Sequence, residues 1–288
     1  MFAYCQHPGR NLELSKTFLD PNLQTVTGAI MTEIILLKHG PIAEIRLNRP
    51  AVLNAMGRNW PADMQSAITE ICEDPEIRVA LLTAEGRSFC SGADLTQLAA
   101  GEIGPRWFHD NEPVFRALET MDKPLIAGIQ GYCIGGGLQI AISCDVRIAA
   151  DDAILGLPAA KEAFLPGMST WRLCRLIGMG HARHLILSGQ NIGPQEAYRI
   201  GLVNLVVPRE SLERELEAMA TRYLEVPTVS LKWAKQLTNQ AFDLPFEQFL
   251  DEFDRAIQVV LASEEHRSAM RAWRERKSRM PQAGNEPR

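Results

Sequence analysis

The feature that most constrains the fold is a run of 21 residues without a charged side chain, from Pro124 to Cys144. A run of this length is long enough to cross a bilayer as a helix. Five of its residues are glycines: Gly128, Gly131, Gly135, Gly136 and Gly137. Glycines at this density break the continuous helix that a lipid-exposed span requires. We therefore expect a buried strand, a glycine turn and a buried helix here, and no membrane span.

Length and composition are those of a globular protein. The chain has 288 residues, 46% hydrophobic and 23% charged, which is enough to bury a substantial core. A formal net charge of −5 argues against nucleic acid or an anionic membrane as the main partner. The six cysteines include no C-x-x-C pair, and residues 1–30 contain no long apolar core of a signal peptide. These features favour reduced thiols and a cytoplasmic location.

Short apolar runs alternate with amphipathic helical patterns until about residue 208, which predicts an α/β core with parallel strands. Predicted strands are 32–38, 43–47, 79–83, 124–130 and 146–149, with helices at 60–72, 111–121 and 138–143. Four helices follow at 211–223, 228–238, 246–261 and 264–277, and these either cover the core or pack against another subunit. The predicted organisation is a poorly ordered extension (1–30), the α/β core (31–208), a helical region (209–280) and a disordered tail (281–288).

Two glycine-rich segments, 86–95 and 131–140, each follow a predicted buried strand. Small residues at a strand-to-helix turn leave backbone N–H groups exposed at the positive end of the helix dipole. Two such turns at neighbouring strand ends can direct two N–H donors at one oxygen, forming an oxyanion hole. The alternative is a pair of tight turns that only permits close packing of helix and strand. Neither segment is a G-x-G-x-x-G motif or a P-loop.

Several motifs together resemble the crotonase family, the enoyl-CoA hydratases and isomerases. Residues 48–55 (Asn-Arg-Pro-Ala-Val-Leu-Asn-Ala) are similar to its N-R-P-x-x-x-N-A element, and residues 89–95 and 123–137 are similar to its two oxyanion turns. The likeness covers about residues 32–280. It implies a crotonase (ClpP/crotonase-like) spiral of ββα units with a C-terminal helical trimerisation region. It also implies an acyl-CoA substrate and a homotrimer or dimer of trimers. No cofactor or metal is expected, because coenzyme A is part of the substrate.

The resemblance also assigns residues. It places the two oxyanion donors at the backbone N–H groups of Ala93 and Gly136. The positions that it places beside coenzyme A are Leu53, Asn54, Ala55, Ala93, Asp94, Leu95, Thr96 and Gly136.

The sequence departs from the family at both glutamates of a hydratase. Gln139 stands two residues after the glycine triplet, and Ala159 follows Pro158. An amide does not exchange protons near neutral pH, and losing a general acid or base forfeits about 10²–10⁴ in rate. Glu162 lies three residues after Ala159, on the same face if the chain is helical there. Because one acid–base group suffices to move a proton between two carbons, this pattern favours an isomerase.

Other interpretations stay open at this stage. Glu162 is a surface residue beside Lys161 in the alternative reading, and Gln139 could hold a water for thioester hydrolysis or carbon–carbon cleavage. A non-catalytic acyl-CoA-binding protein is the remaining alternative. Cys90 is expected to be a structural thiol and His109 a surface side chain, while Trp107 is expected to line a pocket or the core.

Overall fold

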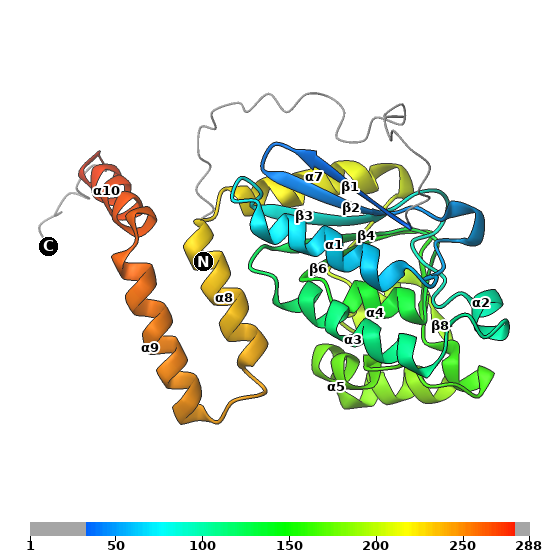
Figure 1. Ribbon diagram of the computed structural model, residues 1–288. Helices are drawn as coiled ribbons and strands as arrows, with labels where there is room; N and C mark the ends of the chain where they lie inside the picture. The colour runs from blue at the N-terminus through cyan, green and yellow to red at the C-terminus, as the bar shows by residue number, and fades with distance from the viewer. Residues whose placement is uncertain (1–32, 280–288) are drawn as a thin grey trace, which may run out of the picture. The chain divides into compact units, whose positions relative to one another are not determined.

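The computed structural model describes residues 33–279, and its centre is a six-stranded sheet of order β1-β2-β3-β4-β6-β9 (Figure 1). The first two strands form an antiparallel hairpin and the later pairs are parallel. These strands are β1 (Ile34–His39), β2 (Ile42–Leu47), β3 (Val79–Ala84), β4 (Leu125–Ile129), β6 (Val146–Ala150) and β9 (Leu205–Val207). The predicted α/β class with parallel strands is therefore confirmed.

A second, smaller sheet was not predicted from the sequence. It has the order β5-β7-β8, with β5 (Tyr132–Ile134), β7 (Ile154–Gly156) and β8 (Asn191–Ile192). These strands are two or three residues long, too short for an alternating pattern to be recognised in the sequence. They matter for the site because β5 leads directly into the second glycine turn.

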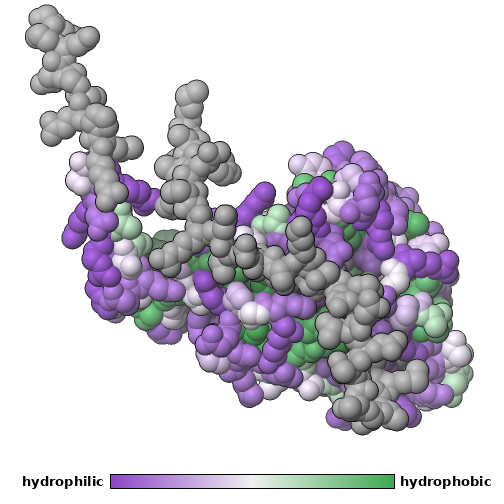
Figure 2. All heavy atoms as spheres, turned by 90° about the horizontal axis from the view of Figure 1, so that it is seen from above, coloured by the Kyte–Doolittle hydropathy of each residue, from purple (hydrophilic) through white to green (hydrophobic). Residues whose placement is uncertain are grey.

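Helices cover both faces of the large sheet. One face packs on α1 (Trp60–Glu73), α3 (Pro105–Thr120) and α4 (Gly136–Ile142), whose apolar side chains share a core with alternate residues of β3 and β4. The other face packs on α7 (Leu212–Leu224). A Cβ atom at Gly128 would lie only 2.4 Å from Leu216 Cδ1, so glycine permits this helix to approach the sheet. Figure 2 shows a mainly hydrophilic surface with smaller hydrophobic areas in between.

Further helices complete the described chain: α2 (Leu95–Ala99), α5 (Ser169–Ser188), α6 (Pro194–Arg199), α8 (Thr228–Gln240), α9 (Phe246–Ala262) and α10 (Glu264–Arg279). The four C-terminal helices lie where the sequence predicts them. Of the two alternatives for this region, α7 covers the core. Helix α8 is tied to the core by Lys235, whose Nζ lies 2.7 Å from Asp145 Oδ2. In contrast, α9 exposes large apolar side chains, among them Phe246, Leu250 and Phe253.

Helix α3 begins at Pro105 and not at Asn111, because Pro105 occupies its first turn and the charged residues that follow obscure the apolar period. The predicted extension 1–30 and tail 281–288 lie outside the described residues. Among residues 33–279, no helix is both long and apolar enough to cross a membrane.

Candidate active site

The first glycine turn presents the backbone amide of Ala93. Ala93 pairs with Met56 in an isolated parallel bridge. Its neighbours form the hydrogen bonds of that bridge: Met56 N donates to Gly92 O at 2.8 Å, and Asp94 N donates to Met56 O at 3.0 Å. The Ala93 N–H is directed to the opposite side of the strand. It finds no hydrogen-bond acceptor within residues 33–279.

The second glycine turn presents the amide of Gly136, the first residue of α4. Gly135 precedes it with a φ of 57°, a conformation that favours glycine, and its N–H donates to Gly156 O at 2.9 Å. The first N–H groups of a helix have no partner inside the helix. In the described chain the Gly136 N–H donates to no internal acceptor, and it carries the positive end of the α4 dipole.

The two turns lie against each other. A Cβ atom at Gly92 would lie 3.2 Å from Gly136 N, and one at Gly136 would lie 3.6 Å from Ala93 N. At Gly137 a Cβ atom would lie 2.3 Å from Cys90 O, so only glycine allows this approach. Both uncommitted amides therefore border the same small space, where they can donate to a single oxygen.

This space opens into a pocket of about 530 Å³. The pocket is lined largely by apolar groups, including the rings of Trp107, Phe108, Phe115 and Phe164. The Phe108 ring lies 4.9 Å from that of Trp107, edge to face, and 4.9 Å from that of Phe164. Such a wall suits an apolar chain that extends from an oxygen held at Ala93 and Gly136.

The position of Glu162 agrees with its predicted spacing. It ends a 3₁₀-helix, η2 (Pro158–Glu162), in which residues three apart lie on one side. Both Ala159 and Glu162 line the pocket. The Glu162 side chain is exposed and has no hydrogen-bond or ion-pair partner among residues 33–279. It is thus a carboxylate that is available to a bound molecule.

A second carboxylate in the pocket, Glu112 of α3, was missed by the sequence analysis. Its Oε1 accepts hydrogen bonds from Gln139 Nε2 (2.8 Å) and Met168 N (3.2 Å), and its Oε2 accepts one from Arg172 Nη1 (2.8 Å). Arg172 is buried and also pairs with Glu119. These three donors fix the orientation of the Glu112 carboxylate.

Gln139 is held at both ends of its amide. While Nε2 donates to Glu112, Oε1 accepts a hydrogen bond from Ser169 Oγ at 3.0 Å. The side chain is 5% exposed but still lines the pocket beside Gly136. Gln139 therefore contributes a fixed, uncharged group and not a proton carrier.

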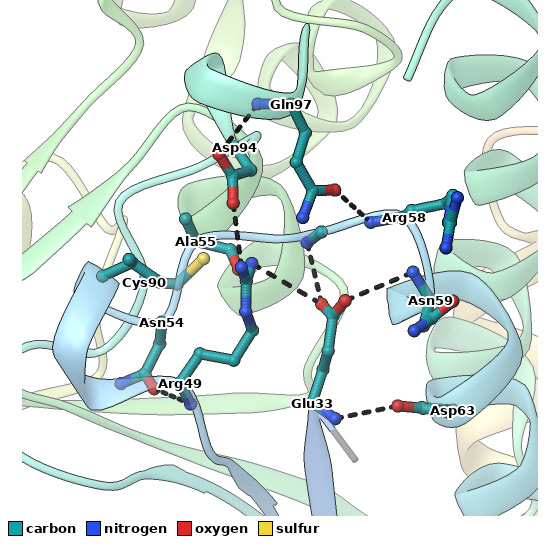
Figure 3. Close-up of polar contacts among 12 residues, drawn as sticks. Glu33, Arg49, Asn54, Ala55, Arg58, Asn59, Asp63, Cys90, Asp94 and Gln97 are labelled. Carbon is teal, nitrogen blue, oxygen red and sulfur yellow. Dashed lines mark hydrogen bonds and ion pairs between the residues drawn. The ribbon is translucent and has the colours of Figure 1, made fainter. Parts of the chain in front are cut away.

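The loop that carries Ala93 is supported from outside the pocket (Figure 3). Arg49 donates to Asp94 Oδ2 at 2.9 Å and to Ala55 O at 2.6 Å. Burial opposes ionisation of Asp94, but hydrogen bonds from Gln97 N, Arg49 and Thr96 N outweigh it, and the pKa of the carboxyl is lowered. The carboxylate of Asp94, the residue after Ala93, is therefore held in place by hydrogen bonds.

A buried carboxylate lies on the other side of Arg49 (Figure 3). Glu33 accepts hydrogen bonds from Gly57 N at 2.8 Å and Asn59 N at 3.2 Å, so it anchors the segment that follows Met56. Burial raises its pKa, while these hydrogen bonds and Arg49 act in the opposite direction. The segment that pairs with Ala93 is thus fixed through its backbone.

The residues predicted to bind coenzyme A fall into two groups. Ala93, Leu95 and Gly136 line the pocket. Leu53, Asn54, Ala55, Asp94 and Thr96 do not line it. The Asn54 side chain is buried, and it accepts from Arg49 N and donates to Glu85 O and Ser88 O. Its role in the structure is therefore to hold the turn.

The other two candidate side chains, Cys90 and His109, have no chemistry in the pocket. Burial raises the pKa of the Cys90 thiol to about 12, so the thiol stays protonated. His109 is 82% exposed, contacts Asp110 and does not line the pocket. Both agree with the non-catalytic interpretation.

Residues 38–282 match the family model described as enoyl-CoA hydratase/isomerase. The chain belongs to the enoyl-CoA hydratase/isomerase family. A short-chain-enoyl-CoA hydratase of Clostridium acetobutylicum is 36% identical over 251 residues, which is 86% of this chain and 96% of that one. A crotonyl-CoA hydratase of Syntrophomonas wolfei is 33% identical, over 85% and 95% of the two chains.

Solved structures of the family confirm the fold. An enoyl-CoA hydratase from Bacillus anthracis superposes with a TM-score of 0.81 and is 30% identical, covering 85% of this chain and 96% of that one. The predicted crotonase fold is thereby confirmed. The protein is an acyl-CoA enzyme of this family. The two glycine turns and the pocket between them lie within the matched residues.

Proposed function

We propose that the protein moves a proton between the α- and γ-carbons of an enoyl-CoA, which shifts the double bond. The Glu162 carboxylate takes a proton from the α-carbon of a 3-enoyl-CoA. The negative charge that develops on the thioester oxygen is stabilised by the amides of Ala93 and Gly136. Glu162 then returns the proton to the γ-carbon, so the double bond ends between the α- and β-carbons. The reaction needs no group beyond the protein and the thioester.

The observation that carries this proposal is the pairing state of the two pocket carboxylates. Glu112 is engaged by three donors, whereas Glu162 is exposed and unpaired within the described chain. A group that must accept and release a proton has to be free to approach the substrate. A free carboxylate in the same pocket as two backbone N–H donors is the smallest set of groups that can move a proton between two carbons of a thioester.

Hydration is the second candidate, because the two relatives described above are named hydratases. Water addition needs a group that holds the water at the β-carbon. Glu112 supports this alternative, since its Oε1 lies 2.8 Å from the amide nitrogen of Gln139 and the side chain is 27% exposed. Glu112 would then orient the water and Glu162 would exchange the proton.

The mass of the product distinguishes these reactions. The protein is incubated with 3-hexenoyl-CoA and with 2-hexenoyl-CoA in D₂O, and the products are analysed by mass spectrometry. Isomerisation gives 2-hexenoyl-CoA, which has gained no water and is separated from 3-hexenoyl-CoA by chromatography; it carries deuterium to the extent that Glu162 exchanges its proton with D₂O before returning it. Hydration adds one water to 2-hexenoyl-CoA, and thioester hydrolysis or carbon–carbon cleavage releases a fragment. Binding without any product would support the non-catalytic alternative.

We propose further that the chain assembles as a homotrimer or a dimer of trimers. Helix α9 exposes Phe246 (73%), Leu250 (44%) and Phe253 (44%), and a second copy of the chain would cover them. Sedimentation equilibrium measures the assembly directly. A monomer at micromolar concentration would contradict this proposal.

A further inference from the structure

The charges of the pocket restrict the acyl groups that it can bind. Among the residues that line it, two carry a formal charge, Glu112 and Glu162, and both are acidic. None of the lining side chains in the described range 33–279 is a lysine, arginine or histidine. The nearby cation Arg172 does not line the pocket and is engaged by Glu112 and Glu119. A negative charge on the acyl chain would therefore meet acidic groups and no free cation.

The hydrogen-bond donors of the pocket point to the same restriction. Four lining side chains carry an N–H or O–H donor, and each already donates at least one hydrogen inside the protein, which leaves only the second amide hydrogen of Asn111 and of Gln139. Trp107 donates to Gly57 O, Asn111 to Trp107 O, Gln139 to Glu112, and Ser91 to Val52 O. The acceptors are less occupied, because Glu162 has no partner and Asn111 Oδ1 is a buried acceptor without one in the described chain. A carboxylate needs donors, and a buried carboxylate without them is strongly disfavoured.

We propose that this pocket selects acyl chains without a carboxylate, and that Glu112 determines this preference by keeping Arg172 from the bound chain. A neutral chain lies against the aromatic rings at no electrostatic cost. A chain that ends in a carboxylate would lose its hydration and be repelled by Glu112 and Glu162. The proposal rests on the proposed function only in anchoring the thioester at Ala93 and Gly136.

Competition binding with saturated acyl-CoAs tests this without turnover. Hexanoyl-CoA and adipoyl-CoA share a six-carbon chain and differ in a terminal carboxylate, and octanoyl-CoA and suberoyl-CoA form the matching eight-carbon pair. We expect each carboxylate-bearing ligand to bind at least about 100-fold more weakly than its partner. The methyl ester of adipoyl-CoA, which is larger but neutral, should bind within about fivefold of hexanoyl-CoA. Equal affinity within a pair, or an ester as weak as adipoyl-CoA, would overturn the proposal.

Two variants test the role of Glu112. In Glu112→Gln the Arg172 guanidinium loses the charged partner that separates it from the pocket. The affinity for adipoyl-CoA should therefore rise at least about tenfold relative to the affinity for hexanoyl-CoA. Glu119→Gln is the matched control, because it removes the other partner of Arg172 but lies outside the pocket lining, and the ratio should stay unchanged. An unchanged ratio in Glu112→Gln would refute the assignment to Glu112.

The experiments distinguish a failure of the proposed selectivity from a failure of the proposed function. Turnover of 3-hexenoyl-CoA with equal affinities for both members of each pair would overturn only the selectivity. Retained selectivity without any isomerisation would overturn only the proposed reaction.

Discussion

Replacing Glu162 with glutamine isolates the proposed proton carrier. The amide has almost the same shape but cannot exchange a proton near neutral pH. Loss of a general acid–base group lowers turnover by about 10²–10⁴, or about 3–5 kcal/mol of barrier at 1.36 kcal/mol per tenfold. Because the exposed Glu162 side chain has no partner in the described chain, the free energy of unfolding should change by less than about 0.5 kcal/mol.

The assay should follow the chemical step without assuming the product. Exchange of the α-proton of an acyl-CoA with D₂O, read by mass spectrometry, reports enolate formation directly. Glu102→Gln is a suitable control, because Glu102 is exposed and does not line the pocket. We expect slow exchange in Glu162→Gln, normal exchange in the control, and unchanged affinity for hexanoyl-CoA in both. Exchange at the wild-type rate in Glu162→Gln would refute the assignment of the proton carrier.

Three further predictions concern the support of the site. The lowered pKa of Asp94 means that its carboxylate stabilises the fold above the unfolded value near 3.8 and loses this effect as pH falls through the folded pKa. Asp94→Asn, which weakens the contact with Arg49, should therefore cost about 1–3 kcal/mol in urea unfolding at pH 7 and less at pH 3, and an equal cost at both would contradict this. Cys90, with a pKa of about 12, should resist maleimide labelling at pH 8 in the native protein but react in urea, as peptide mapping can check. Gly137→Ala should destabilise the folded protein by about 1–3 kcal/mol in thermal unfolding. Gly180→Ala is the control, because a Cβ atom there meets no neighbour, and it should be neutral or stabilising. A Gly180→Ala protein less stable than Gly137→Ala would contradict the packing argument.

Much of this architecture is visible in the sequence. Continuous apolar runs such as 79–83 are typical of strands buried on both faces, and the uncharged run 124–144 indicates strand β4, a turn and helix α4, although not the short strand β5. Gly135 of the second turn also has a local cause, because its φ of 57° favours glycine. Features that a few neighbouring residues determine could thus be predicted.

Glu112 could not be found in this way. It lies 27 residues before Gln139 in the sequence, and its place in the pocket depends on its hydrogen bonds to Gln139 of α4 and Arg172 of α5. Its pairing with Arg172 joins residues 60 positions apart. No local pattern encodes these contacts. The absence of both hydratase glutamates and the candidate Glu162 could be read from the sequence, whereas Glu112 required the fold.

The central claim is that the thioester oxygen receives hydrogen bonds from the amides of Ala93 and Gly136. Infrared difference spectroscopy of bound hexanoyl-CoA, labelled with ¹³C at the thioester carbonyl, measures this directly. Two donors in a site shielded from water should polarise the C=O bond, so its stretching frequency should fall below that of the free thioester in water. A bound carbonyl at or above the frequency of the free thioester would contradict the account.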